Sequence, residues 1–121
     1  MRFFCMYKPS DRMSAESGAP PSPEHLAKMG AFMEEMAKAG VLVDTGGLHP
    51  SSQGATVRLS NGKVTVSNGP IGEKKELVSG YAILQTNTKE EAIALTKRFL
   101  EVAGDGETEL RQLYEPSDFG G

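Results

Sequence analysis

Two amphipathic helix patterns, each set between strand-like runs, constrain the fold of this chain most strongly. Apolar residues recur at three- and four-residue spacing between Pro23 and Gly40, and again between Thr88 and Gly104, which predicts one helix in each segment. A β-branched or aromatic run precedes and follows each helix. Two such β-α-β units predict an α+β fold, a ferredoxin-like sandwich with both helices on one face of an antiparallel sheet.

The ends of both predicted helices carry local signals. Ser22 is a suitable N-cap for the first helix, and Gly40 is a suitable residue to end it. Thr88 and Glu91 have the spacing of a capping box, and Gly104 stops the second helix.

The main sheet is expected to hold four strands, within Arg2–Lys8, Val41–Val43, Leu77–Thr86 and Glu107–Leu113. Thr45-Gly46-Gly47 is expected to end the second strand, because glycine weakens strands. Cys5 is the only cysteine and lies in the first apolar run. We expect it to be a buried strand residue. The alternative, a nucleophile, lacks a neighbour that would lower the thiol pKa.

The two β-α-β units are separated by an insertion. Thr56–Val66 is predicted to be a β-hairpin, because Asn61-Gly62 joins two β-branched runs. The segment 10–23 is rich in Ser, Gly, Ala and Pro and is expected to be a mobile surface loop of a single domain, 1–121. The sequence leaves open whether the hairpin joins an interface or stands apart.

One face of the predicted sheet has no helix to cover it. Every predicted strand contains apolar residues, so this face is expected to be covered. A second copy of the chain is the simplest cover. We therefore expect a homodimer whose sheets face each other in a dimeric α+β barrel.

Composition excludes several classes of function. The chain of 121 residues has a net charge of −3 and no basic stripe, which disfavours nucleic-acid binding. Its apolar runs are too short for a membrane span and its N-terminus lacks a signal-peptide pattern, so we expect a cytoplasmic protein that does not bind a membrane. No patterned metal ligands and no phosphate loop occur, so no cofactor or metal is predicted.

Several runs carry a family resemblance: Phe32–Met36, Ala39–Val43, Gly47–Ser51, Thr56–Arg58, Asn61–Lys63, Asn68–Pro70, Glu73–Glu76 and Gly80–Tyr81. With them the chain resembles the YCII-related proteins of the DGPF-motif type, from Phe3 to Leu113. The motif itself reads Asn68-Gly69-Pro70-Ile71, without the family's Asp and Phe. The resemblance implies a dimeric α+β barrel and a family without a firmly established reaction.

The resemblance also implies candidate catalytic residues. Some relatives are thought to use a His-Asp pair in a cleft, with the His early in the first helix. His25 matches that position, and Asp44 is the nearest acidic candidate after the helix. The first helical turn favours a neutral imidazole that can act as a base. The alternative is a half-exposed helix residue without a chemical role.

A further set of residues is a candidate ligand site: His49, Arg58, Glu73, Lys75 and Tyr81. His49 lies in a loop, where functional residues concentrate, although a His-Pro pair is also ordinary at the end of a strand. The charged run 73–76 is either a solvated turn or part of a cleft under the 10–23 loop. In the cleft it would hold an anionic or polar small molecule together with Arg58 and Tyr81.

Two functions follow from these patterns. The first is a small hydrolytic or isomerising enzyme with His25 as general base. The second is a dimeric ligand-binding or regulatory module that uses the same cleft without turnover. A stable dimer with no chemistry is the plain alternative to both.

Overall fold

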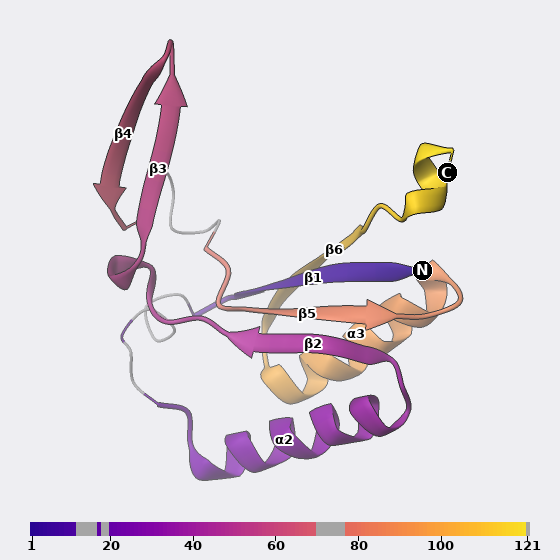
Figure 1. Ribbon diagram of the computed structural model, residues 1–121. Coiled ribbons are helices and arrows are strands. Elements are labelled where there is room, and N and C mark those ends of the chain that lie inside the picture. The colour runs from indigo at the N-terminus through magenta and orange to yellow at the C-terminus, as the bar shows by residue number, and fades with distance from the viewer. Residues whose placement is uncertain (12–16, 18–19, 70–76, 121) are drawn as a thin grey trace.

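The computed structural model describes residues 1–11, 17, 20–69 and 77–120. Its main sheet has four antiparallel strands in the order β2-β5-β1-β6. The strands are β1 (Arg2–Pro9), β2 (Leu42–Gly47), β5 (Gly80–Gln85) and β6 (Gly106–Gln112). Helices α2 (Pro23–Lys38) and α3 (Lys89–Ala103) both lie below this sheet in Figure 1. This is the ferredoxin-like α+β arrangement that the sequence predicts.

Side chains cap both helices at the predicted residues. Ser22 Oγ accepts a hydrogen bond from the backbone N–H of His25 at 3.1 Å, and Thr88 Oγ1 accepts one from the N–H of Glu91 at 3.1 Å. The carboxylate of Glu91 accepts from the N–H of Asn87, one residue before the cap. The local signals for both helices are therefore confirmed, with the second bond of the capping box displaced by one residue.

The core lies between α3 and the helix-facing side of the sheet. Phe3, Cys5 and Leu84 pack around Ala92, which is fully buried. Phe3 stands opposite Leu84 in the strand register, and Cys5 stands opposite Ala82. Burial raises the pKa of the Cys5 thiol to about 11. The expectation that Cys5 is a buried strand residue is confirmed.

Strand β2 corrects one expectation from the sequence. It does not end at Thr45-Gly46-Gly47 but continues through Gly47, after an irregularity in the register between Leu42 and Asp44. Gly46 is needed for packing: a Cβ atom there would lie 2.9 Å from Cε1 of Tyr81 on the neighbouring strand. The glycine lets the aromatic ring lie against the strand, which sequence periodicity does not reveal.

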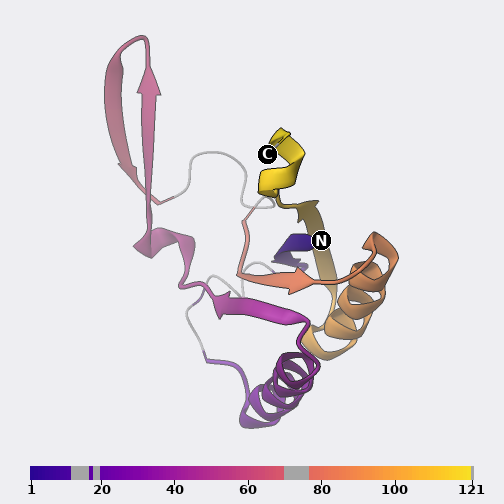
Figure 2. The ribbon, with the colours of Figure 1, turned by 45° about the vertical axis from the view of Figure 1, so that its right-hand side comes forward.

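The predicted hairpin region forms a separate two-stranded sheet. Strands β3 (Ala55–Ser60) and β4 (Lys63–Asn68) pair antiparallel, and the short 3₁₀ helix η1 (Ser51–Gln53) joins them to β2. The turn residues Asn61 and Gly62 have φ angles of 51° and 77°, as a type I′ turn requires. Figures 1 and 2 show this hairpin projecting away from the main sheet, on the side opposite the helices.

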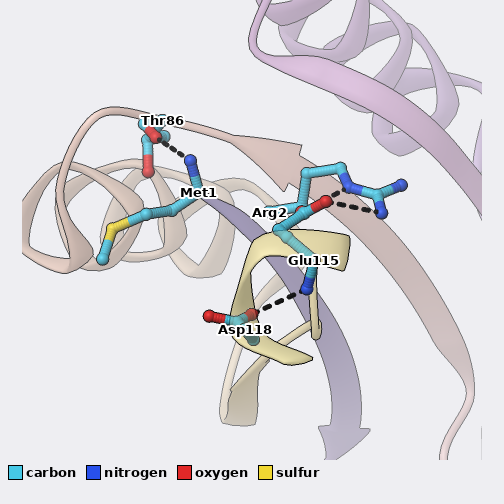
Figure 3. Close-up of polar contacts among 5 residues, drawn as sticks. All are labelled: Met1, Arg2, Thr86, Glu115 and Asp118. Atoms are coloured by element: carbon cyan, nitrogen blue, oxygen red, sulfur yellow. Dashed lines mark hydrogen bonds and ion pairs between the residues drawn. The ribbon is translucent and has the colours of Figure 1, made fainter. Parts of the chain in front are cut away.

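The chain ends in a short 3₁₀ helix, η3 (Pro116–Phe119), which polar contacts attach to the start of β1 (Figure 3). Nε of Arg2 donates to Glu115 Oε1 at 2.8 Å, and Nη2 of Arg2 donates to Glu115 Oε2 at 3.2 Å. These bonds lower the pKa of Glu115. Asp118 Oδ2 accepts from the N–H of Glu115, and the Met1 ammonium donates to the carbonyl of Thr86.

In the described part of the chain, no helix is long and apolar enough to cross a membrane.

Candidate functional site

A cavity of about 890 Å³ lies between the two helices and the sheet. Most of its lining is apolar, with side chains from α2, α3 and three strands: Leu26, Met29, Phe32, Met33, Met36, Leu95, Phe99, Cys5, Leu42, Ala82 and Leu84. The volume is that of a typical small-molecule site. The cavity is therefore the principal candidate site in the described part of the chain.

Helix α2 supplies a row of methionines to this cavity. Met29, Met33 and Met36 follow one another at four- and three-residue spacing, so they share one face of the helix. Met36 is buried in the core, whereas Met29 and Met33 are only half-buried. Helical spacing alone marks all three as core residues, but in the structure all three line the cavity. Methionine suits such a wall because its unbranched side chain adapts to different shapes.

One buried hydroxyl in the cavity lining has no hydrogen-bond partner among the described residues. Thr108 Oγ1 is inaccessible to solvent and unpaired. The other lining threonines are satisfied, since Thr96 Oγ1 donates to the carbonyl of Ala92 at 2.8 Å and Thr45 Oγ1 donates to that of Tyr81 at 2.9 Å. An unpaired buried hydroxyl is unfavourable, so Thr108 would gain a hydrogen bond if its side chain turned toward a polar atom of a ligand in the cavity.

Tyr7 stands opposite Thr108 on the neighbouring strand. Its ring meets that of Phe99 edge to face, with centroids 5.3 Å apart. Its hydroxyl lies 3.3 Å from the carbonyl oxygen of Gly104 and 3.2 Å from that of Asp105. Burial, followed by the charge of Asp105, raises the pKa of Tyr7. This end of the cavity therefore combines an aromatic wall with two hydroxyl groups.

His25 is half-buried and contributes to the lining of the same cavity. It lies in the first turn of α2, and its backbone N–H is the group that Ser22 caps. Ser10, Asp11, Pro20 and Pro21 line the cavity with it. Within the described residues, no hydrogen bond to the imidazole ring is formed. In the part of the chain that the structure describes, the ring nitrogens of His25 therefore have no orienting partner of the kind that a poised catalytic base requires.

Asp44 is paired with Tyr81 rather than with His25. Its Oδ2 accepts from the Tyr81 hydroxyl at 3.1 Å, and its Oδ1 accepts from the N–H of Thr45 at 2.8 Å. Asp44 is not part of the cavity lining to which His25 contributes. The hydrogen bond to Asp44, more than the carboxylate charge, raises the pKa of Tyr81. The phenyl ring of Phe4 stacks on the ring of Tyr81, with centroids 5.6 Å apart and an interplanar angle of 13°.

Of the candidate ligand-binding residues, the structure describes His49, Arg58 and Tyr81, and it does not bring these three together. His49 is exposed between β2 and η1, and Arg58 is exposed on β3; neither lines the cavity. Tyr81 borders the cavity, although its ring stacks on Phe4 on the sheet face away from the helices. Glu73 and Lys75 lie outside the described residues, as do Pro70 and Ile71 of the DGPF-like corner.

Gly69 of that corner is described and buried. It has a φ angle of +82°, and its N–H donates to the carbonyl of Gly54. This backbone geometry favours glycine, so Gly69 has a structural role at this corner.

Sequence reasoning did not identify Tyr7 and Thr108 as site residues. The signal available was the alternation of the last strand, which puts Thr108 and Leu110 on one side. This alternation does not show that the Thr108 hydroxyl would remain without a hydrogen bond.

Within the described ranges, no group of three or more His, Cys, Asp or Glu side chains is arranged to hold a metal ion.

Comparison with known proteins gives two findings. The model of the YCII-related domain matches residues 1–115. The solved structure of 5-chloro-2-hydroxyhydroquinone dehydrochlorinase (TftG) from Burkholderia phenoliruptrix AC1100, in complex with 2,5-dihydroxybenzoquinone, has a similar fold. Its TM-score is 0.52 at 12% sequence identity, with 98% of each chain covered. No curated protein sequence matches this chain.

Proposed function

This chain belongs to the YCII-related family, and from that premise we propose that it binds a small aromatic or quinonoid molecule with oxygen substituents. The proposed site is the cavity between the helices and the sheet. The observation that carries the proposal is a cavity of about 890 Å³ with apolar walls and one buried hydroxyl, Thr108 Oγ1, that is unpaired within the described chain. A largely apolar pocket with few placed polar groups is the usual form of a small-molecule site.

The walls favour a planar ring as the body of the ligand. Phe32 and Phe99 both line the cavity, with ring centroids 6.5 Å apart and planes tilted by 45°. The half-buried Met29 and Met33 add polarisable thioethers, which make favourable contacts with aromatic rings. Aromatic and methionine side chains together suit a flat unsaturated ring better than a strongly charged ligand.

The polar end favours oxygen substituents. An unpaired buried hydroxyl costs about 1–3 kcal/mol, which a ligand oxygen or hydroxyl would recover by bonding to Thr108. Tyr7 is close to this position as its cross-strand neighbour. The complex of TftG with 2,5-dihydroxybenzoquinone supports this class of ligand, since that protein has the same fold.

Acid-base catalysis by His25 is the second candidate function. His25 is the only imidazole that contributes to the described cavity lining, and its ring has no hydrogen-bond partner among the described residues. It is thus available to exchange a proton with a bound phenol or enol. Among the described residues no hydrogen bond orients the His25 ring, which is the reason to place binding before catalysis. A non-catalytic regulatory module would use the same cavity without this step.

A homodimer with facing sheets is the proposed assembly. Phe4, Met6, Tyr81 and Ile83 alternate with the core residues, so they lie on the sheet face away from the helices, where each is half-buried in the single chain. Apolar side chains in this number favour cover by a second sheet, which would complete a dimeric α+β barrel. A cytoplasmic location stays a prediction from the sequence.

Titration calorimetry with 2,5-dihydroxybenzoquinone tests the proposed binding. Thr108→Val removes the hydroxyl at nearly constant volume and is expected to weaken binding about tenfold, the value of one net hydrogen bond. Thr65→Val, on the exposed hairpin, is the matched control and should bind like the wild type. Absence of heat at millimolar ligand, or equal affinity for both variants, would contradict the proposal. If the protein converts the bound ligand, a conversion rate that His25→Gln lowers at least 100-fold at unchanged affinity would support acid-base catalysis by His25.

A further inference from the structure

The projecting hairpin has one face that carries four aliphatic side chains. We call the segment Ala55–Asn68 the arm. Val57 stands opposite Val66, and Leu59 stands opposite Val64, so these four side chains share one face. Their relative exposures are 66%, 66%, 70% and 61% in the same order. The other face of the arm carries hydroxyl and basic side chains, including Arg58 and Thr65.

The four exposed aliphatic side chains do not stabilise the arm in the single chain, because they are not packed on any other part of the described structure. Hydrogen bonds from Thr56 Oγ1 to the carbonyl of Gly69, at 2.8 Å, and from the N–H of Gly69 to the carbonyl of Gly54, at 2.9 Å, close the base of the hairpin itself. A two-stranded hairpin is at best marginally stable in water unless its apolar face packs on something. Four neighbouring aliphatic side chains that all face solvent therefore indicate a docking surface.

A second exposed apolar surface lies near the C-terminus. The rings of Tyr114 and Phe119 have centroids 5.0 Å apart, and each residue is 74% exposed. We call these two residues the C-terminal patch. The bidentate pair of Arg2 and Glu115 holds the patch in place against β1. The patch is thus a preformed aromatic surface whose outer side is exposed to solvent.

The arm and the segment that carries the C-terminal patch have net charges of opposite sign. The arm contains two basic residues, Arg58 and Lys63, and no acidic residue. Residues 113–120 contain two acidic residues, Glu115 and Asp118, and no basic residue. Opposite net charge favours the approach of the two segments, whereas the contact itself would be apolar, because Arg58 and Lys63 lie on the other face of the arm and Glu115 is paired with Arg2.

Their positions exclude contact within one chain and fit contact between two chains. Figures 1 and 2 show both on the side of the sheet away from the helices, with the arm at one end of the sheet and the C-terminal segment at the other. A two-fold rotation that faces two sheets and exchanges their ends carries the arm of one chain to the C-terminal end of the other.

We propose that the arm of one protomer docks its apolar face on the C-terminal patch of a second copy of this chain. The proposal rests on the homodimer suggested above and assigns the inserted hairpin to its interface. A symmetric pair of such contacts places an arm at each end of the two facing sheets.

Sedimentation velocity over a range of protein concentrations tests the role of the arm. Leu59→Asn places an amide on the apolar face and is expected to raise the dimer Kd at least tenfold. Thr65→Asn introduces the same residue on the other face of the arm and should leave the Kd within twofold of wild type. Equal Kd values for the two variants would overturn the docking of the arm and leave the dimer intact. A wild type that is monomeric throughout would overturn both the dimer and the arm contact.

Cross-linking tests which surface the arm meets. A variant with Leu59→Cys and Phe119→Cys should form disulfide-linked dimers under mild oxidation, since Cys5 is buried and does not compete. Thr65→Cys with Phe119→Cys is the control and should remain largely unlinked. Equal linking of the two variants, or none in a dimeric protein, would overturn the contact. Calorimetry of the cavity ligand is independent of these outcomes, so the two proposals fail separately.

Discussion

The hydroxyl of Tyr81 donates a hydrogen bond of 3.1 Å to Oδ2 of Asp44, across the neighbouring strands β5 and β2. Phe4 stacks on the same Tyr81 ring, and Gly46 gives the ring its space. Asp44 thus belongs to a cluster around Tyr81 and not to the environment of His25. This pairing separates two residues that family resemblance would combine in one catalytic pair.

Asp44→Asn is expected to lower the pKa of Tyr81. The Asp44 hydrogen bond favours the protonated phenol and raises its folded pKa above the usual value of about 10. Its contribution to stability is therefore present below about pH 10 and is lost as pH rises through the folded pKa. Absorbance at 295 nm across alkaline pH measures the shift, with Tyr81→Phe to assign the transition. Identical titration curves for Asp44→Asn and wild type would contradict the hydrogen bond.

Gly46→Ala is expected to destabilise the fold by about 1–3 kcal/mol, the usual range for overpacking. The new Cβ would lie 2.9 Å from Cε1 of Tyr81 and would displace the ring from Asp44 and Phe4. Gly47→Ala is the matched control, since its Cβ would have no atom within 4 Å. Urea unfolding should give a lower midpoint for Gly46→Ala only. Equal midpoints would show that the ring does not pack on Gly46.

Cys5 is expected to be unreactive in the folded protein. Its pKa of about 11 leaves about one thiolate in a thousand at pH 8, and the sulfur is buried. An aromatic disulfide reagent should therefore titrate no thiol in native protein within minutes and one thiol in denaturant. Rapid reaction of the native protein would mean that the core around Cys5 opens readily.

Glu115→Gln is expected to loosen the C-terminal segment at neutral pH only. The folded pKa of Glu115 is lowered by the Arg2 hydrogen bonds, so the stabilisation is present above the unfolded pKa of about 4.3 and is lost as pH falls through the folded value. Hydrogen exchange of residues 113–119 should be faster in the variant at pH 7. At about pH 3 the exposed pair contributes little, and the two proteins should differ less. A difference in exchange rate between the two proteins that grows toward low pH would contradict the predicted direction of the pH dependence.

The parts of the fold that the sequence predicts correctly are those with local causes. The caps at Ser22 and Thr88 and the turn at Asn61-Gly62 act through backbone groups a few residues away, so spacing alone identifies them. The continuation of β2 through Gly46 was missed because it depends on Tyr81, a residue on another strand.

The site was less predictable because it depends on register and on the spacing of layers. Asp44 meets Tyr81 only through the pairing of β2 with β5. Met29 and Met33 become cavity wall because α2 leaves a cavity of about 890 Å³ between itself and the sheet. Helical periodicity identifies the face of α2 that turns inward, but it does not determine how closely that face approaches the sheet.

The methyl resonances of methionine test the proposed cavity most directly. Met29, Met33 and Met36 line it, whereas Met6 points to the other face of the sheet, opposite Tyr81 and Glu109 in the register, and Met1 is half-exposed at the N-terminus. In protein labelled with ¹³C at these methyl groups, 2,5-dihydroxybenzoquinone should shift the resonances of Met29, Met33 and Met36 in a saturable way and leave those of Met1 and Met6 in place. Shifts confined to Met1 and Met6, or no shifts at millimolar ligand, would contradict the account.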